Sequence, residues 1–316
     1  MSKTHYWLGG LLAFQLILAA VVFWAGGPSL GDPRQGPLFD FQAETIDKIV
    51  LSDSENSITL AKQDGRWQLP ELEQLPAQSG KIEDLLSNLA SFAPNWPVAT
   101  TAASLKRFEV ADDSFQRRIQ LYNSESLTDE ALLGTSPGFR KSHIRKKGDD
   151  AIYTIALNSF ELPVRSQDWL DKSLLRAGEI ERIEGADFAI EKAEALWRFA
   201  TGEGAPSGEL DQDKTLKLAT ALETLQIDGI ADKAPEQEVK TLKVKDKNGE
   251  WIYRFVQDGD DYYVSRNDRK TVFTITKFDY DRIAGVVSAQ LFKEKPQAEQ
   301  EAKEEEPKTN GQQPAQ

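Results

Sequence analysis

The side chains that most often perform catalysis are scarce in this sequence. Its 316 residues include no cysteine and two histidines, His5 and His143. The lack of cysteine excludes disulfides, thiolate metal sites and cysteine nucleophiles, and a site built from several histidines is excluded by count. A Ser–His–Asp arrangement would have to use His143, because His5 lies beside a long apolar run. The sequence therefore predicts no catalytic residue, no metal site and no cofactor, and we expect His143 to be an ordinary surface histidine.

Five basic residues surround His143 and contrast with an otherwise acidic chain. The segment 139–147 reads FRKSHIRKK, and its cations are Arg140, Lys141, Arg145, Lys146 and Lys147. Such a cluster can bind a phosphate, an anionic glycan or an acidic protein surface. The cations also disfavour the protonated form of His143 and so lower its pKa. The alternative is a solvated strand face, on which alternate side chains point to water. These five residues are the candidate patch for an anionic partner.

Carboxylates and glycines complete no known binding motif. The segment Asp258–Asp261 (DGDD) resembles half of an EF-hand loop, but Arg269 occupies the twelfth position, where glutamate is required. A turn explains this segment better. The glycines of Gly202–Gly204 (GEG) and of Gly134-x-x-x-Gly138 lack the lysine and the strand-to-helix setting of a phosphate-binding loop. A hydrolase that uses carboxylates alone stays an alternative, and it would need two close carboxyls with raised pKa values.

Tryptophans offer a second kind of candidate binding surface. Those outside the N-terminal run are Trp67, Trp96, Trp169, Trp197 and Trp251. They could stack on sugar rings, but tryptophans at the starts of strands and helices are more often buried anchors of the core. We expect core anchors, and substitution of Trp67 or Trp197 by alanine should then destabilise the fold by roughly 3–5 kcal/mol.

The strongest positional signal is the apolar run Tyr6–Ala25, YWLGGLLAFQLILAAVVFWA. At 1.5 Å per residue, roughly 20 helical residues span about 30 Å, the hydrocarbon thickness of a bilayer. Lys3 precedes the run and no basic residue follows before Arg34, which favours a cytoplasmic N-terminus and a periplasmic remainder. A cleaved signal peptide is the alternative, although its apolar core is usually only about 7–15 residues long. We expect an uncleaved transmembrane anchor over residues 1–27.

The rest of the chain is predicted to hold two similar α+β modules. In the first, over residues 42–177, strands IDKIVL, SITLA and RWQL precede a helix, KIEDLLSNLASF, and a meander that ends in IYTIAL. In the second, over residues 178–293, IERI and LWRF precede a helix, DQDKTLKLATALETLQ, and a meander that ends in TVFTIT. This order predicts an internal duplication in which each module is an antiparallel sheet with a packed helix. The alternative is that any α+β chain gives similar strings.

Two polar segments flank the predicted modules. Residues 28–41 are rich in glycine and proline, which predicts a spacer between the anchor and the first module. Residues 294–316 are mostly Glu, Lys, Gln, Pro and Ala, and too few apolar residues remain there to offset the entropy of ordering. This acidic tail is therefore predicted to be disordered.

Several of these motifs resemble those of the bacterial domain-of-unknown-function 4340 family. The resemblance lies in IDKIVL, DGRWQL, KIEDLLSNLASF, YTIALNSFEL and DWLDKSLL, and it extends over most of residues 46–292. Members of that family are often encoded beside genes for ABC transporters of the gliding-motility type. The resemblance implies an envelope protein that is anchored in the bacterial inner membrane and accessory to a transporter. It carries over no active-site residue.

Charge and composition narrow the class of partner. The chain has 51 acidic and 38 basic residues and a formal net charge of −13, which argues against binding to nucleic acid or to anionic lipid. We therefore expect a single-pass, non-enzymatic protein of the inner membrane, with its bulk in the periplasm. Its expected partners are inner-membrane proteins such as ABC transporter subunits. The alternative is a binding module for envelope glycan or lipid.

Overall fold

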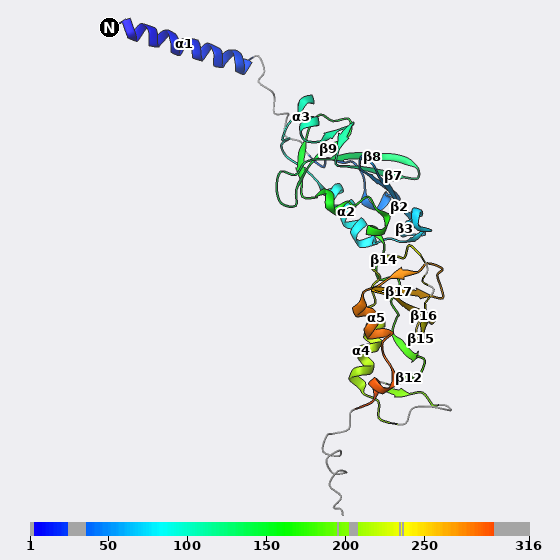
Figure 1. Ribbon diagram of the computed structural model, residues 1–316. Helices are drawn as coiled ribbons and strands as arrows, with labels where there is room; N and C mark the ends of the chain where they lie inside the picture. The colour runs from blue at the N-terminus through cyan, green and yellow to red at the C-terminus, as the bar shows by residue number, and fades with distance from the viewer. Residues whose placement is uncertain are drawn as a thin grey trace, which may run out of the picture. The chain divides into compact units, whose positions relative to one another are not determined.

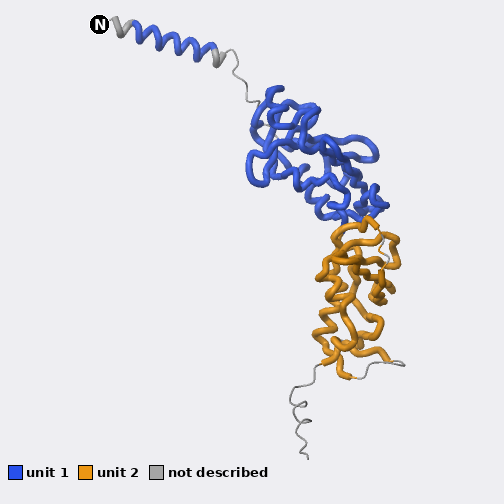
Figure 2. The backbone as a smooth tube through the Cα atoms, in the orientation of Figure 1, with its two compact units in different colours: residues 1–171 blue, residues 172–316 orange. Residues whose placement is uncertain are grey.

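The computed structural model describes residues 3–24, 36–194, 196–201, 208–233, 235 and 237–293. The chain forms two compact units, Met1–Asp171 and Lys172–Gln316 (Figure 2). The boundary between the units falls a few residues before the predicted one, between residues 177 and 178. Three predictions fall outside the described residues: they concern positions 28–35 of the spacer, the GEG motif at 202–204 and the tail over 294–316.

The first element is α1 (Lys3–Trp24), a 22-residue helix made mostly of apolar residues (Figure 1). Its described side chains, Trp7–Val21, are all exposed. Among the described residues, no helix combines the length and the hydropathy of a membrane-crossing segment. The crossing of a membrane by α1 therefore stays a prediction.

The first unit is built on an antiparallel sheet. Among its described residues the sheet has eight strands, in the order β10-β9-β8-β7-β1-β2-β3-β4. These strands are β1 (Lys48–Ser52), β2 (Ser57–Gln63), β3 (Arg66–Leu69), β4 (Leu75–Pro76), β7 (Arg117–Asn123), β8 (Ser126–Leu133), β9 (Ser142–Lys146) and β10 (Tyr153–Ile155). The unit also contains β5 (Val110–Ala111), β6 (Ser114–Phe115), α2 (Ser79–Ser91), α3 (Ala102–Arg107) and the short 3-10 helices η1 (Ala43–Thr45), η2 (Pro70–Leu72), η3 (Ser159–Glu161) and η4 (Ser166–Trp169).

The predicted apolar stripe of α2 is confirmed. Ile82, Leu85, Leu86 and Leu89 recur at helical spacing and are all buried. The helix begins at Ser79, with Gln78 as its N-cap, two residues before the predicted segment KIEDLLSNLASF. Helix boundaries depend on local backbone angles, which apolar periodicity does not encode.

The second unit is built on another antiparallel sheet. Among the described residues it also has eight strands, in the order β13-β12-β11-β15-β16-β17-β18-β14. They are β11 (Ile180–Glu184), β12 (Ala189–Ala193), β13 (Leu196–Phe199), β14 (Gly229–Ile230), β15 (Val239–Asp246), β16 (Gly249–Asp258), β17 (Asp261–Arg266) and β18 (Phe273–Thr274). Helices α4 (Gln212–Glu223) and α5 (Lys277–Ile283) contact the sheet and each other, and the 3-10 helix η5 (Ser288–Leu291) follows (Figure 1).

The α+β class and the antiparallel sheets are confirmed. The two sheets also share an order, because β3-β2-β1-β7-β8-β9-β10 in the first corresponds to β13-β12-β11-β15-β16-β17-β18 in the second. In each unit a helix follows the third of these strands along the chain. Helix α2 lies between β3 and β7, and α4 lies between β13 and β15. Among the strands missed from the sequence, two are five residues or longer. Strand β12 (AIEKA) carries a single fully apolar core residue, and β8 begins with exposed residues, so both alternate poorly.

Candidate functional site

The basic cluster of the first unit is largely neutralised within the unit itself. Arg145 is buried, donates from Nε to the Val110 carbonyl oxygen at 2.6 Å and forms an ion pair with Asp112. Lys146 lies 2.7 Å from Asp129, and Lys147 lies 3.0 Å from Glu130. The paired carboxylates of Asp129 and Glu130 are themselves buried on β8. Two of the five predicted cations, Lys146 and Lys147, therefore stabilise buried acidic groups, and a third, Arg145, is itself buried and paired with the exposed Asp112.

The other two members of the cluster are placed differently. Arg140 and Lys141 are exposed in the turn before β9, and Arg140 has a positive φ of 53°. The prediction that alternate residues of this strand face solvent was wrong for β9, where residues 142–145 are all buried. The structure therefore separates the five residues into two exposed cations in a turn and three that are engaged with the chain.

His143 is buried, and the prediction of a surface histidine was wrong. It is 6% exposed, its ring centroid lies 4.3 Å from that of Phe108, and its Nδ1 lies 2.8 Å from the carbonyl oxygen of Thr135. Burial lowers the pKa of His143, and the hydrogen bond with Thr135 opposes this in part. The direction of the shift was predicted, but its cause is desolvation instead of the neighbouring cations.

Three of the five tryptophans are confirmed as core anchors. Trp67 and Trp169 are 1% and 0% exposed, and Trp197 is 8% exposed. Trp251 is half-buried, and Trp96, at 57% exposed, was predicted incorrectly. Trp96 lies beside prolines in an irregular segment, where no strand or helix directs the side chain inward.

The Asp258–Asp261 segment is a hairpin turn, as predicted. It joins β16 to β17, and Gly259 has a φ of +60°, which glycine adopts without strain. Among the described residues, no group of three or more His, Asp or Glu side chains is placed to hold a metal ion.

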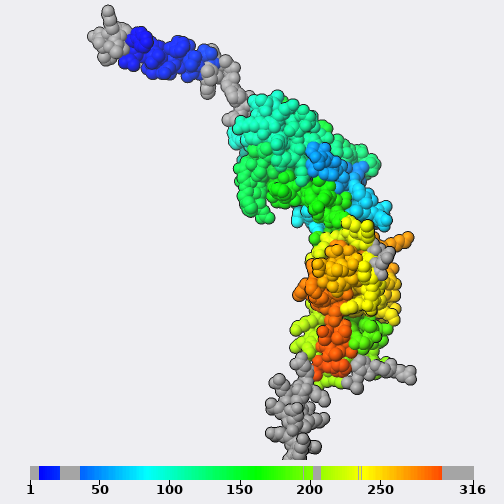
Figure 3. All heavy atoms as spheres, in the orientation of Figure 1, coloured from blue at the N-terminus to red at the C-terminus, as the bar shows by residue number. Residues whose placement is uncertain are grey.

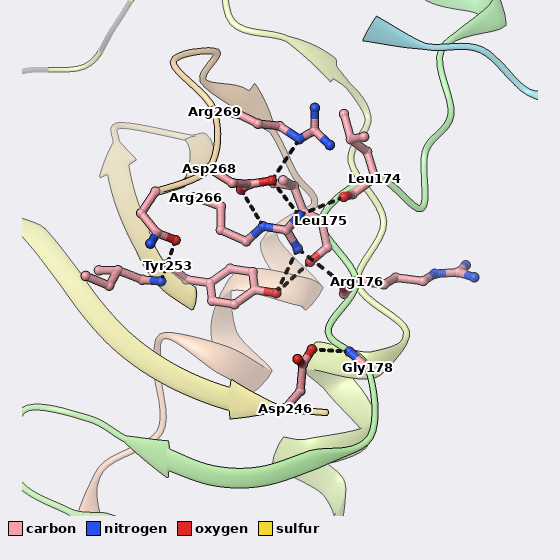
Figure 4. A network of polar contacts seen from close by, with 11 residues as sticks. Leu174, Leu175, Arg176, Gly178, Asp246, Tyr253, Arg266, Asp268 and Arg269 are labelled. Carbon is pink, nitrogen blue, oxygen red and sulfur yellow. Dashed lines mark hydrogen bonds and ion pairs between the residues drawn. The ribbon is translucent and has the colours of Figure 1, made fainter. Parts of the chain in front are cut away.

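The buried guanidinium of Arg266 binds the segment with which the second unit begins (Figure 4). Arg266 donates to the carbonyl oxygens of Leu174 and Arg176 at 3.3 and 3.2 Å, and its Nη1 lies 3.3 Å from the Tyr253 hydroxyl. It also pairs with Asp268 at 2.7 Å. This network ties the segment before β11 to strands β16 and β17.

The charges of this network are set by burial and by each other. Burial alone would raise the pKa of the Asp268 carboxyl, but the Arg266 guanidinium outweighs it and lowers that pKa. Burial raises the pKa of the Tyr253 hydroxyl, and Arg266 opposes this in part. Since every partner is held by another group of the chain, the network is a structural element of the fold.

An apolar groove lies next to α4 and α5 in the same unit. Helix α4 is capped by Asp211, whose Oδ1 accepts from the backbone nitrogens of Asp213 and Lys214 at 3.0 and 3.1 Å. Gln212 then fixes the start of the helix to strand β13, because its side-chain amide exchanges hydrogen bonds of 2.9 and 2.8 Å with the backbone of Trp197. These contacts set which side of α4 faces the core.

The inner side of α4 is apolar and buried, and its outer side is not entirely polar. Leu218, Ala221 and Leu222 of the helix are buried, as is Leu225 just after it. Leu216 lies on the opposite side of the helix and is 57% exposed. Helix α5 adds a second exposed apolar side chain, Phe278, which is 70% exposed. In Figure 3 the yellow-green surface of α4 and the orange-to-red surface from α5 onward lie next to each other.

The groove between these elements has a volume of about 1060 Å³. Its apolar lining comes from Leu216, Leu218, Phe278, Val286, Leu291 and Phe292. Its charged lining comes from Lys214, Lys217, Arg282, Lys293 and a single acidic residue, Asp213. An open apolar floor with a mostly cationic rim suits an amphipathic segment that carries apolar and acidic side chains.

The groove was not predicted from the sequence, although both helices were. The available signal was the presence of Leu216 and Phe278 on helix faces that periodicity assigns to solvent. A single exposed leucine or phenylalanine is common, and only the fold places the two beside one groove.

Comparisons with known proteins give a family and no closer relative. No curated protein and no solved structure matches the chain significantly. The sequence model of a family described as "Domain of unknown function (DUF4340)" matches residues 67–247, which is more than half of the chain and runs from β3 into the β15–β16 turn. The chain therefore belongs to the DUF4340 family.

Proposed function

We propose that this protein is a membrane-anchored, non-enzymatic interaction protein whose second unit docks a partner protein in the groove beside α4 and α5. The groove carries the proposal. It exposes two large apolar side chains, Leu216 and Phe278, at 57% and 70%, and both line the same groove. Exposed apolar surface of this size, bordered by charged residues, is typical of an interaction site.

The charges around the groove favour an acidic amphipathic helix as the docked segment. Lys217 is exposed at its border, while Arg282 is held by Asp279 at 2.7 Å and Lys293 by Glu209 at 2.9 Å. A helix that lays apolar residues on Leu216 and Phe278 could place carboxylates beside Lys217. The partner class that this favours is a protein with a short helix of alternating apolar and acidic faces.

The proposed anchor is α1. Its 22 helical residues would extend about 33 Å at 1.5 Å per residue, enough to match a bilayer core. The described side chains Trp7–Val21 are exposed and mostly apolar, which suits contact with lipid. We infer an inner-membrane location with a cytoplasmic N-terminus and the two units in the periplasm. Subunits of an ABC-type transporter are the proposed partners, on the basis of the family resemblance.

We also infer that the two units arose by duplication. Seven strands follow the same order in both sheets, and α2 and α4 occupy the same place in that order. The buried positions also recur at the same spacing, as 82, 85, 86 and 89 in α2 and 215, 218, 219 and 222 in α4. This correspondence pairs Leu216 with Glu83, which is exposed on α2.

Co-isolation from membranes tests the function. The full-length protein is extracted in mild detergent, and its partners are quantified by mass spectrometry for the unaltered chain, for Leu216→Glu and for the control Glu83→Ala. We expect Leu216→Glu to lose the partner, because a carboxylate would be buried against an apolar face, and Glu83→Ala to keep it. Equal recovery in all three would refute the groove as the docking site. A protein found in the carbonate-soluble fraction without residues 1–27 would refute the anchor.

A further inference from the structure

Strand β15 lies between β11 and β16 in the sheet and extends beyond the end of β11. It pairs with β16 over its whole length, from Val239↔Val256 to Asp246↔Gly249. Its pairing with β11 ends at Glu184↔Lys243. Among the described residues, none pairs with β15 at positions 239–242 on the side away from β16. Four residues in the middle of the sheet order therefore have a free edge.

The direction of the backbone groups at this edge follows from the ladder. Ile252 of β16 bonds with Asn267, at the end of β17, through both its backbone oxygen and its backbone nitrogen. Successive residues of a strand alternate in direction, so Tyr253 and Phe255 point toward β15. Their partners Leu242 and Lys240 then point toward β16. The N–H and C=O groups of Thr241 and Val239 consequently point to the free edge.

Open space lies alongside these groups. A cavity of about 470 Å³ is bordered by residues 238–243, by the β11–β12 turn over residues 184–188 and by residues 284, 286 and 287. Its lining includes Phe188, Leu242 and Val287, with Lys240 and Glu238 among its polar members. We call this space the β15 slot. Its polar backbone groups and apolar walls are the two features that receive an extended peptide.

The first unit shows that a strand fits at this place. There β1 pairs with β7 for two residues more, through Leu51↔Ile119 and Ser52↔Arg118. Matching the central pairs Ile49↔Leu121 and Ile183↔Val244 places Arg118 where Thr241 lies. In the second unit the chain turns at Gly185 instead, and Gly185 N–H donates to the Phe188 carbonyl oxygen at 2.9 Å. The position that Ser52 fills in one unit is left open in the other.

We propose that the β15 slot binds an extended segment of a partner protein, which adds a short antiparallel strand beside Val239–Leu242. The segment would exchange backbone hydrogen bonds with Thr241 and Val239, as Ser52 does with Arg118 in the first unit. Its residue opposite Leu242 would face the apolar side of the slot, next to Val287, and therefore has to be apolar. The residues on either side of it would face solvent beside Thr241.

This site is separate from the groove on which the proposed function rests. Val286 lines both, but Leu216 and Phe278 line the groove alone, and Thr241 and Leu242 line the slot alone. Each site can thus fail its own test without deciding the other. Both can be occupied by neighbouring parts of one partner.

Photo-crosslinking in intact cells tests the slot. A benzoylphenylalanine replaces Val287 in the full-length chain, and adducts are mapped by mass spectrometry in three backgrounds: unaltered, Thr241→Ser and Thr241→Pro. Proline removes the N–H group on the free-edge side only, whereas serine keeps it. We expect adducts on one short segment of another protein, retained in Thr241→Ser and reduced about tenfold in Thr241→Pro, as loss of a backbone hydrogen bond and the proline ring's bulk dictate.

If Thr241→Pro does not fold, hydrogen exchange of the backbone amides in the unaltered chain tests the same proposal. In the purified, detergent-solubilised chain the Val239 and Thr241 amides should exchange faster than that of Leu242, and in the crosslinked complex they should be protected. Adducts that persist in a folded Thr241→Pro variant would overturn the proposal. So would adducts confined to a second copy of this chain or to its own residues, an absence of adducts, or equal exchange of the three amides.

Discussion

The outer sides of α2 and α4 differ, although the two helices occupy the same place in their units. On α2 the exposed positions carry Gly80, Glu83, Asp84 and Ser87, which water solvates well. On α4 the matched exposed positions include Leu216, which borders the groove. The same apolar stripe thus builds the core in both units, while only the second unit adds an apolar residue to the opposite face.

The sheets differ at a matched place as well. In the first unit β1 covers β7 as far as Ser52, and Arg117 then reaches across to the Leu162 carbonyl oxygen at 2.7 Å. In the second unit β11 stops at Glu184 and leaves the β15 slot. From this comparison we infer a division of roles, in which the second unit carries the two proposed partner surfaces, the groove and the β15 slot.

The largest effects should come from the matched tryptophans of the third strands. We expect Trp67→Ala to destabilise the first unit by about 3–5 kcal/mol, since it removes a fully buried indole, and Trp197→Ala to destabilise the second by about 3 kcal/mol. Hydrogen exchange of peptides from each unit reports the two effects separately. If either variant were as stable as the unaltered chain, the indole would not belong to a shared core and the correspondence between the units would weaken.

The Arg266 network should give the next largest effect, confined to the second unit. Replacement by methionine removes the donor to the Leu174 carbonyl and leaves Asp268 with Arg269 as its remaining ion-pair partner. We expect a loss of about 2–3 kcal/mol, below the usual 3–5 kcal/mol for a buried pair, because Asp268 is partly exposed and keeps this second partner. Chemical denaturation followed by exchange of residues 172–293 measures it. Lys277→Met, which removes an exposed pair with Asp281, is the control and should be nearly neutral.

Proline at matched strand positions should separate a paired edge from a free one. Arg118→Pro removes a ladder donor to Ser52, and we expect a cost of about 2 kcal/mol or more relative to Arg118→Ala. Thr241→Pro relative to Thr241→Ala should cost less than about 1 kcal/mol, because the lost N–H group faces the slot. Equal costs at the two positions would show that the edge of β15 is already paired.

The smallest predicted effect concerns pH. His143 is the single histidine of the sequence outside α1, and burial holds its pKa below the usual value near 6.5. Its contribution to stability is therefore complete above about pH 6.5 and is lost as the pH falls through the folded pKa, since the unfolded state binds the proton first. Unfolding of the first unit should show this dependence, and His143→Gln should remove it. A second unit that showed the same step would contradict the assignment to His143.

The parts of the fold that repeat a period were predictable from the sequence. The strand SITLA and the helix around Leu85 alternate or repeat clearly, and both lie where expected. Strand β12 was missed because its outward residues are mixed and only Ile190 is a fully buried apolar residue. The family resemblance, which rested on such repeated motifs, is confirmed by the match over residues 67–247.

The candidate sites were much less predictable, because they depend on contacts between distant residues. The basic segment around Lys146 looked free in the sequence, but its acidic partner Asp129 lies 17 residues earlier, on the neighbouring strand. The groove needs Leu216 and Phe278 from two helices. The slot results from a turn at Gly185 that ends β11 early. The residue at which a strand ends relative to its neighbour in the sheet depends on tertiary structure, and local sequence patterns do not predict it.

The most direct measurement of the difference between the units is photo-crosslinking at one matched pair of positions. Benzoylphenylalanine is placed at Leu216 or at Glu83 of the full-length chain, cells are irradiated, and adducts are quantified by mass spectrometry. Both positions are exposed on the outer side of their helix, so accessibility is matched. We expect a defined adduct with one partner segment at Leu216 and none at Glu83. Adducts of equal yield to the same partner at both positions, or none at Leu216, would contradict it.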